Sequence, residues 1–147
     1  MSMMQVSRKV DYALRAIIYL STQSEGRPVP VKEIAYRRRI PTKFLEKIIQ
    51  DLIRAGLVKS HRGAHGGYTL ERTPDQVSFR DVIEAIEGPI SLNVCVTERH
   101  DCSVLSSCNM QRIWQEGQRQ MLKYFSDTTL ADLIPLLPSN TSSQATV

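Results

Sequence analysis

The feature that most constrains the fold of this chain is a glycine-rich stretch between two short strand-like segments. The stretch Arg62-Gly63-Ala64-His65-Gly66-Gly67-Tyr68 joins two runs with the composition of short strands, 57–60 and 68–71. Glycine adopts positive φ angles at little cost, so this stretch predicts a tight β-hairpin. Two predicted helices come directly before it, and a helix-turn-helix followed by a hairpin is the element order of a winged helix.

Apolar residues at helical spacing predict three helices before the hairpin. The first is expected over about residues 7–23 with Ser7 as its cap, and the second over Val31–Arg38. The third begins near Thr42 and ends before Gly56, a residue suited to a left-handed stop. Its apolar stripe is made of Phe44, Leu45, Ile48, Ile49, Leu52 and Ile53.

Three more helices are expected after the hairpin. Ser78 and Asp81 predict a capping box at the start of the fourth helix, which ends at Gly88-Pro89. Thr129 is expected to cap a last short helix over residues 130–136. Between them lies a long helix over about 109–125, whose spacing of apolar and small residues is typical of a coiled-coil seam: Met110, Trp114, Gly117 and Met121.

The predicted fold class is therefore mainly α: a winged helix-turn-helix with a small β-hairpin wing and a long C-terminal dimerisation helix. Four regions follow from this prediction. They are a winged-helix DNA-binding domain (1–88), a cysteine-containing sensor loop (89–108, the cysteine loop), the dimerisation helix with the last short helix (109–137), and a polar, disordered tail (138–147).

Positive charge is concentrated in the second and third helices and the hairpin. Residues 32–62 hold nine lysines and arginines against three acidic residues, whereas the rest of the chain holds ten basic and twelve acidic residues. A positive segment on a near-neutral chain is typical of a protein that binds a polyanion such as DNA. Charge alone leaves a solvated surface as the alternative.

The start of the third helix carries the side chains expected to read DNA, because an α-helix enters the major groove with its first turns at the base edges. Thr42 and Lys43 can reach phosphates or bases, with Lys47 one turn later. Glu46 can accept a hydrogen bond from a cytosine amino group, or it can pair on the surface with Lys43 or Gln50. Phosphate contacts are expected from the three arginines before this helix, Arg37, Arg38 and Arg39.

The hairpin tip supplies a second set of predicted DNA contacts. Gly63 and Gly66 let the backbone approach DNA closely, and Arg62 can enter a narrow minor groove, where the negative potential is enhanced. His65 can touch a phosphate, whereas Tyr68 is expected to pack against the third helix. An ordinary tight turn is the alternative for this stretch.

Three cysteines lie within fourteen residues: Cys95, Cys102 and Cys108. An odd number in a chain with no recognisable secretory signal argues against a disulfide framework. The spacing suits zinc poorly, because zinc ligands are usually paired two to four residues apart. Iron–sulfur clusters accept three cysteines plus another ligand from a loose loop, and Arg99, His100 and Arg112 would favour the thiolate form. Three unrelated thiols are the alternative.

These segments together resemble one family, the winged-helix regulators that include the iron–sulfur cluster regulator IscR and the nitric-oxide-sensitive repressor NsrR. The resemblance covers about residues 4–137. It rests on the segments 11–16, 44–48, 56–58, 62–68 and 129–133 and on the cysteine triplet. It implies a homodimer that crosses at the long helix, a palindromic DNA operator, and an operator affinity that depends on the state of a cluster.

The resemblance also bears on the ligands of that cluster. IscR-like members carry a histidine three residues after the last cysteine, as the fourth ligand of a 2Fe–2S cluster, and here that position is Gln111. Some NsrR-like members complete a 4Fe–4S site with an aspartate from the first helix of the partner subunit, and Asp11 matches that position. The implied ligands are the three cysteines and Asp11 of the partner subunit, with 4Fe–4S favoured over 2Fe–2S. His100 is the local alternative, and Asp11 can instead pair with Arg8 or Arg15. The first cysteine gap, six residues where five is common in the family, is a further departure.

The expected function is that of a cytoplasmic DNA-binding transcription regulator, a repressor, whose iron–sulfur cluster responds to nitric oxide, redox conditions or iron–sulfur status. One alternative is the same DNA-binding fold acting through thiol-redox chemistry without a cluster. Another is a small metal-binding protein without DNA function. The chain has no Ser/His/Asp set, phosphate loop or HExxH motif, so neither an enzyme nor a small-molecule substrate is expected. Its longest apolar run, 16–20, is too short for a membrane span.

Overall fold

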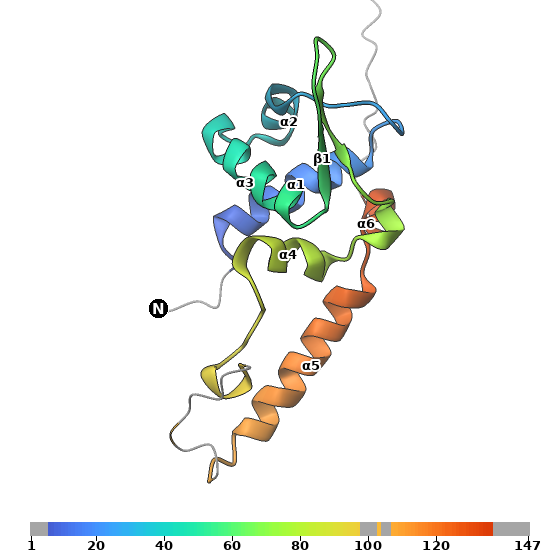
Figure 1. The fold of residues 1–147 in the computed structure, drawn as a ribbon. Coiled ribbons are helices and arrows are strands. Elements are labelled where there is room, and N and C mark those ends of the chain that lie inside the picture. Colours follow the sequence, from blue (N-terminus) through green and yellow to red (C-terminus); the bar gives the residue numbers. More distant parts are fainter. Residues whose placement is uncertain (1–5, 98–102, 104–106, 137–147) are drawn as a thin grey trace, which may run out of the picture.

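The structure is a computed structural model, and it describes residues 6–97, 103 and 107–136 (Figure 1). Three helices come first, α1 (Arg8–Ser21), α2 (Val31–Arg38) and α3 (Thr42–Arg54), followed by the strands β1 (Val58–His61) and β2 (Gly67–Leu70). Then come α4 (Phe79–Glu87), α5 (Gln111–Asp127) and α6 (Leu130–Leu133), with short 3-10 turns at 74–76, 94–96 and 134–136. The expected winged helix-turn-helix is therefore confirmed.

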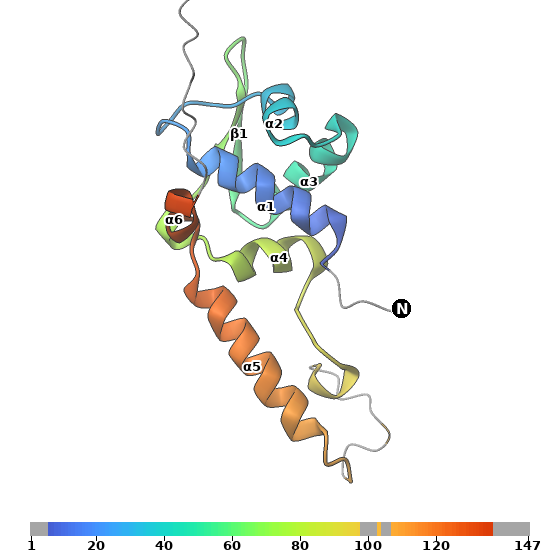
Figure 2. The ribbon, with the colours of Figure 1, turned by 180° about the vertical axis from the view of Figure 1, so that it is seen from behind.

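α1 lies at the centre of the winged-helix domain and packs against α2, α3 and α4 (Figure 2). Its apolar residues recur every three or four positions and share one buried face: Val10, Ala13, Ala16, Ile17 and Leu20. α3 contributes a matching face of Leu45, Ile48, Ile49 and Leu52. Because each fully buried Leu or Ile stabilises a fold by about 1.5–3 kcal/mol, this shared core fixes the rotation of α3 about its own axis.

Side-chain caps begin three of the helices where the sequence predicts them. Ser7 Oγ accepts a hydrogen bond from the backbone N–H of Val10 at 3.3 Å. Ser78 and Asp81 form the predicted capping box, with N–H to oxygen distances of 2.9 and 3.0 Å. Thr129 forms a second box with Asp132 at the start of α6. These bonds satisfy N–H groups that the first turn of a helix leaves without partners.

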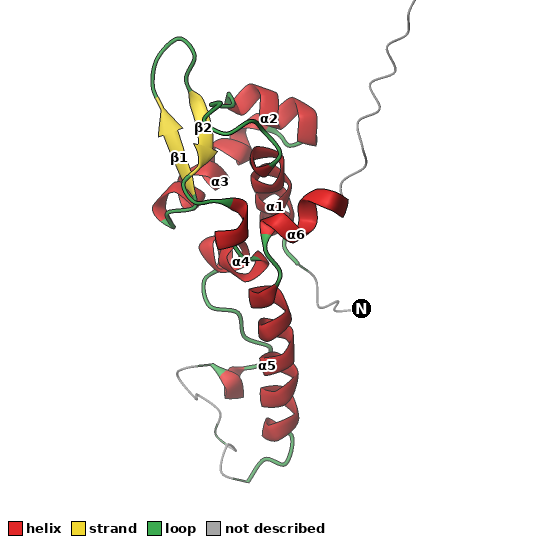
Figure 3. Ribbon diagram, turned by 90° about the vertical axis from the view of Figure 1, so that its right-hand side faces the viewer, coloured by secondary structure: helices red, strands yellow, loops and turns green. Residues whose placement is uncertain are grey.

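The wing is an antiparallel hairpin whose register runs from Val58 opposite Leu70 to His61 opposite Gly67. The tip-side half of β2 gains a third segment beside it, because Val29 and Tyr68 exchange two backbone hydrogen bonds of 2.9 Å. A Cβ atom on Gly67 would lie 2.5 Å from the carbonyl carbon of Val29, so only glycine permits this approach. The wing is thus tied to the loop before α2 and projects from the body as a ribbon (Figure 3).

α5 runs away from the winged-helix domain, at the opposite end of the molecule from the wing tip (Figures 1 and 3). Its C-terminal end is joined to the domain by the backbone: Phe79 N–H donates to Thr128 O at 2.8 Å, and Leu130 N–H donates to Val77 O at 2.9 Å. Leu130 is fully buried in the core. No helix in the described part of the chain has both the length and the apolar character needed to cross a bilayer.

The outer face of α5 differs from the predicted seam. Met110, next to its first residue, and Ile113 and Tyr124 within it are 59%, 72% and 72% exposed. Trp114 and Met121 are half-buried, since α4 and the 94–96 turn pack against this helix. α5 also begins and ends two residues later than predicted, and α1 ends at Ser21 instead of residue 23. The predicted disordered tail, 138–147, lies outside the described residues.

Candidate nucleic-acid interface and cysteine loop

α3 turns a polar face outward because its apolar stripe is taken up by the core. Thr42, Lys43, Glu46 and Lys47 are all exposed. The ion pairs among the described residues use other cations, so neither Lys43 nor Lys47 belongs to one. Within the same residues, Glu46 forms neither of the surface pairs that the sequence left open. This face has the form and charge of a helix that enters a DNA groove.

The three arginines at the end of α2 differ in their surroundings. Arg37 and Arg39 are exposed, whereas Arg38 is partly buried and its Nε has no hydrogen-bond partner among the described residues. Arg39 ends α2 in the left-handed conformation, with φ 54°. Glycine is the usual residue there, because a Cβ atom costs roughly 1–2 kcal/mol in that conformation. The exposed and strained Arg39 suits a site for an anionic partner, whereas the Nε atom of Arg38 is shielded from solvent.

A hydrogen-bonded group ties α2 to α1 and to the loop between them. Tyr19 Oη donates to Glu33 at 2.8 Å, and Arg27 reaches both carboxylate oxygens of Glu33 at 3.1 and 3.0 Å. The hydrogen bond from Tyr19, and after it the Arg27 guanidinium, lowers the pKa of Glu33 below its ordinary value. Burial, and then the Glu33 carboxylate, raises the pKa of Tyr19. The first turn of α2 is therefore held by charge as well as by packing.

The wing tip exposes the residues that the sequence predicts to meet DNA. Arg62, Gly63 and His65 are exposed, and Arg62 has no ion-pair partner in the described structure. Gly63 has φ 114°, and a Cβ atom on Gly66 would lie 2.5 Å from the carbonyl oxygen of His61, so the turn itself requires both glycines. Tyr68 is partly buried and packs against the core, whereas its predicted contact with α3 itself stays a prediction.

Two aromatic side chains, one on α2 and one at the start of α3, are exposed although the sequence did not predict their exposure. Tyr36 on α2 is 82% exposed, and Phe44 in the first turn of α3 is 61% exposed. The placement of Phe44 in the apolar stripe of α3 is therefore wrong. At about 100° per residue, Phe44 lies roughly a quarter turn from the centre of the buried face. A helical-wheel projection of the third helix would have placed Phe44 at the edge of the buried face.

The described cysteines lie at the far end of the molecule from the wing. Cys95, in the 94–96 turn, is only 4% exposed, whereas Cys108 is half-buried and lies three residues before α5. Both are free thiols. Cys102, Arg99 and His100 lie outside the described residues. Since the described residues alone bring no three His, Cys, Asp or Glu side chains together, the three-cysteine ligand set stays a prediction.

Asp11, the predicted ligand from the partner subunit, lies on the outer side of α1. Its carboxylate is 2.5 Å from the guanidinium of Arg15, which also lies over the ring of Tyr12 at 5.4 Å. With Arg8 and Arg39, these side chains line an open groove along α1. The ion pair that the sequence left open for Asp11 is thus formed within the single chain, and its role toward a second chain stays a prediction.

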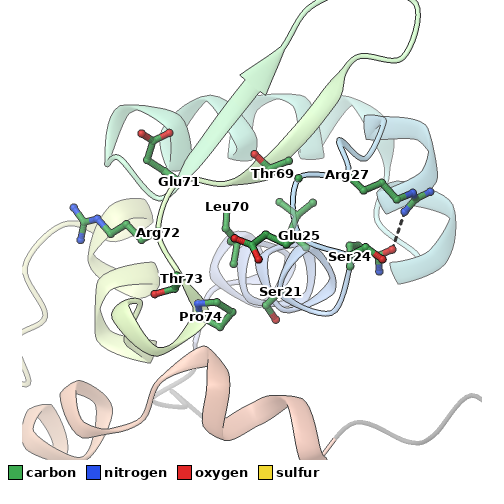
Figure 4. Close-up of a pocket in the computed structure, with 13 residues that line it drawn as sticks. Ser21, Ser24, Glu25, Arg27, Thr69, Leu70, Glu71, Arg72, Thr73 and Pro74 are labelled. Atoms are coloured by element: carbon green, nitrogen blue, oxygen red, sulfur yellow. Dashed lines mark hydrogen bonds between the residues drawn. The ribbon is translucent and has the colours of Figure 1, made fainter.

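A hollow of about 360 Å³ lies between the end of α1, the loop before α2 and the segment after β2 (Figure 4). Glu25, Glu71 and Arg72 line it, and the guanidinium of Arg27 at its edge already donates to Gln23 at 2.7 Å. None of the predicted site residues is among its lining residues. The interface on α3 and the wing, and the cysteine loop, are therefore the candidate sites.

Comparisons with known proteins agree with this geometry. The family model for Rrf2, described as an iron-dependent transcriptional regulator, matches residues 6–135. Protein rrf2 of Nitratidesulfovibrio vulgaris is 33% identical over 140 residues, which are 93% of each chain.

Two solved structures extend the likeness to three dimensions. CymR (YrzC), the global cysteine regulator of B. subtilis, has a TM-score of 0.77 and 34% identity, covering 92% of this chain and 100% of its own. IscR of T. potens has a TM-score of 0.72 and 32% identity, covering 96% and 93%. The fold and the relatives are those of DNA-binding regulators and not of enzymes. The chain belongs to the Rrf2 family of transcriptional regulators.

Proposed function

We propose that this regulator binds a palindromic operator as a homodimer, and that the chemical state of its cysteine loop sets its operator affinity. The observation that carries the proposal is the path of α5. This helix packs against the turn that contains Cys95, and at its C-terminal end it packs against α4 and is hydrogen-bonded to the winged-helix domain. A change at the cysteines therefore has one continuous helix through which to reach the DNA-binding elements.

The proposed DNA contacts come from two elements of each subunit. The first turns of α3 enter the major groove, where Lys43 and Glu46 face base edges and Arg37, Arg38 and Arg39 meet phosphates. The wing places Arg62 in the adjoining minor groove. A two-fold dimer would set its two α3 helices in successive major grooves, about 34 Å apart, which requires a palindromic site. Because bacterial operators lie in the cytoplasm, that is the compartment we propose.

The homodimer is supported by the outer face of α5. Met110, Ile113 and Tyr124 are large apolar side chains that the subunit leaves in water. Burying such surface is favourable by about 25 cal/mol for each Å² removed from water. The same face of a second copy would cover it across a two-fold axis, in the self-complementary way that is usual for dimers.

For the cysteine loop we propose an iron–sulfur cluster, with 4Fe–4S favoured over 2Fe–2S. The described part of the loop offers two free thiols, Cys95 and Cys108, and thiolates are the ligands that such clusters prefer. The iron-dependent description of the family and the likeness to T. potens IscR support this choice. Cys102 and Asp11 of the partner subunit complete the proposed set, for which Asp11 exchanges its ion pair with Arg15. When bound, the cluster supplies a centre that is sensitive to redox state and nitric oxide.

A second candidate uses the same thiols without a cluster. The likeness to CymR of B. subtilis, and to CymR of Staphylococcus aureus in its oxidized form, favours it. Two loop cysteines would pass two electrons and two protons to hydrogen peroxide, which forms one disulfide bond and leaves two molecules of water. In this candidate the change in the loop beside α5 would come from forming the disulfide bond and not from losing a cluster.

Anaerobic purification, followed by visible absorption, iron and sulfide analysis and titration with an operator selected from random DNA, separates the candidates. We expect a coloured protein that contains iron and sulfide, and whose operator affinity changes when a chelator removes the iron. A colourless protein whose affinity changes when mild peroxide links two cysteines would establish the second candidate. A colourless, iron-free protein with the same affinity before and after peroxide would contradict both.

A further inference from the structure

The side chain of Gln118 on α5 binds both ends of the short turn that contains Cys95. We call residues 92–96 the Cys95 turn. Gln118 Oε1 accepts a hydrogen bond from the backbone N–H of Leu92 at 2.9 Å, and Gln118 Nε2 donates to the carbonyl oxygen of Val96 at 3.3 Å. One amide group therefore spans the turn and fastens it to the helix, although these partners are 26 and 22 residues away in sequence.

The Cys95 turn is compact and fits the helix surface beside Gln118. Within it, Val96 N–H donates to the carbonyl oxygen of Asn93 at 3.1 Å. A Cβ atom on Gly117 would lie 3.7 Å from Leu92 Cδ1, an ordinary contact distance, so the leucine side chain rests on this part of α5. Cys95 is 4% exposed, and opening the turn is the local change that exposes its thiol.

The same helix face that carries Gln118 also meets the winged-helix domain. Phe125 lies seven residues, or about two turns, after Gln118, and its ring centroid is 5.2 Å from that of Phe79 at the start of α4. Just beyond, Thr128 and Leu130 are bonded to the domain through their backbone. The Cys95 turn and α4 are thus fastened to one side of one rigid helix.

We infer that Gln118 is the positioning residue that couples the Cys95 turn to α5, and thereby passes the state of the cysteine loop to the DNA-binding domain. The second half of this inference rests on the proposed function. The first half rests on the two hydrogen bonds and the burial of Cys95. We propose no direct contact between Gln118 and a cluster, an oxidant or DNA.

The test compares the rate at which N-ethylmaleimide labels each cysteine in reduced, metal-free full-length chain, read by mass spectrometry of its peptides. Gln118→Ala removes both bonds, whereas Gln118→Glu keeps an acceptor for Leu92 N–H and loses the donor to Val96. Gln115→Ala is the matched control, because Gln115 is exposed on the same helix and does not bond the turn. Thermal melting checks that each variant is folded.

For Gln118→Ala we expect labelling of Cys95 to rise about tenfold, because two hydrogen bonds that favour the closed turn are lost. Gln118→Glu should give a smaller rise. Labelling of Cys108, which these bonds do not hold, should change little, and Gln115→Ala should match the unaltered chain. An unchanged rate at Cys95 in folded Gln118→Ala would overturn the inference.

The second readout is the ratio of operator affinities between the iron-loaded or oxidised protein and its reduced, metal-free form. We expect Gln118→Ala to bring this ratio close to one, with Gln115→Ala unaffected. If Cys95 is released but the ratio keeps its original value, the coupling role is refuted. If the unaltered protein already has a ratio of one, the proposed function fails, and the labelling rates alone then decide whether Gln118 holds the turn.

Discussion

Arg39 occupies a backbone conformation that glycine adopts far more readily than arginine. With φ 54° at the end of α2, it lies three residues before α3, the helix that we propose to enter the DNA groove. Strain of this kind persists where the side chain is needed. We therefore expect Arg39→Gly to leave the free energy of unfolding unchanged or to raise it by up to about 1 kcal/mol, while operator affinity falls. Denaturant unfolding and DNA titration measure the two effects.

The matched variant for this prediction is Arg39→Ala, which removes the charge but keeps the unfavourable φ. Both variants should lose operator affinity to the same extent, whereas only the glycine variant should avoid the conformational cost. Wild-type operator affinity in Arg39→Gly, or a lower stability than that of Arg39→Ala, would show that Arg39 is placed there for another reason.

Arg62 at the wing tip offers a test of groove reading by a single side chain. Arg62→Ala should weaken operator binding by about 1–3 kcal/mol, and the loss should be larger on the operator than on unrelated DNA. Lys59→Ala, at an exposed position lower on β1, is the control and should cost less. An equal loss on all DNA sequences would assign Arg62 to a phosphate instead.

Residue types and spacing identified most of the polar residues of the candidate sites. They could not predict contacts between segments that lie far apart in the sequence. Thr42, Lys43, Glu46 and Lys47 are exposed as expected, because the positions of the buried residues on α3 determine which side faces out. Gln118 could not be found this way, since its partners lie on a loop without periodicity. The exposure of Tyr36 likewise depends on which neighbours the fold places beside α2.

The Glu33 carboxylate ties α2 to α1 and to the loop between them through Tyr19 and Arg27. Its pKa is lowered from the ordinary 4.5, so its contribution to stability is present above pH 4.5 and is lost as the pH falls through the lower pKa of the folded chain. Glu33→Gln removes that contribution. We expect the variant to be less stable than the unaltered chain at pH 6, and the difference to shrink below pH 4.5, as measured by urea unfolding.

Asp75→Asn is the control for this pH series, because Asp75 is an exposed carboxylate that belongs to none of the ion pairs among the described residues. It should show little difference from the unaltered chain between pH 6 and pH 3. A stability gap for Glu33→Gln that stays constant over that range would mean that the group acts through packing and not through its charge.

Elements with a local signal were predicted well, and elements whose faces depend on neighbours were not. α2 has the predicted bounds, and the capping residues of α1, α4 and α6 are the predicted ones. Capping residues can be predicted because a capping hydrogen bond joins residues that are close in sequence. The strands are shifted by one residue, as the pairing partner sets their ends. On α5 the apolar positions were identified, but their division between an inner and an outer face follows from the packing of α4 and the Cys95 turn.

The outer face of α5 is the surface through which we propose that two copies of the molecule form a dimer. Ile113→Glu would place a charge in the proposed contact between two copies, and we expect the protein to become monomeric by sedimentation velocity. Operator affinity should then fall at least tenfold, because the two half-sites are no longer bound together. Gln115→Glu, elsewhere on the exposed surface of the helix, should leave both properties unchanged. A dimeric Ile113→Glu variant would place the interface elsewhere.

The wing, which we propose to meet DNA, and the described part of the cysteine loop lie at opposite ends of the molecule (Figures 1 and 2). α5 packs against both the Cys95 turn and α4, so it is the helix through which we propose that the two sites communicate. The coupling expected between two such sites is about 1–3 kcal/mol, or roughly 5–150-fold in affinity.

The most direct test is the operator affinity of one anaerobic preparation, measured at one salt concentration before and after its iron is removed by a chelator under reducing conditions. We expect the two dissociation constants to differ by at least about fivefold. Equal constants for an iron-containing protein and its stripped form would contradict the claim that the cysteine loop controls DNA binding.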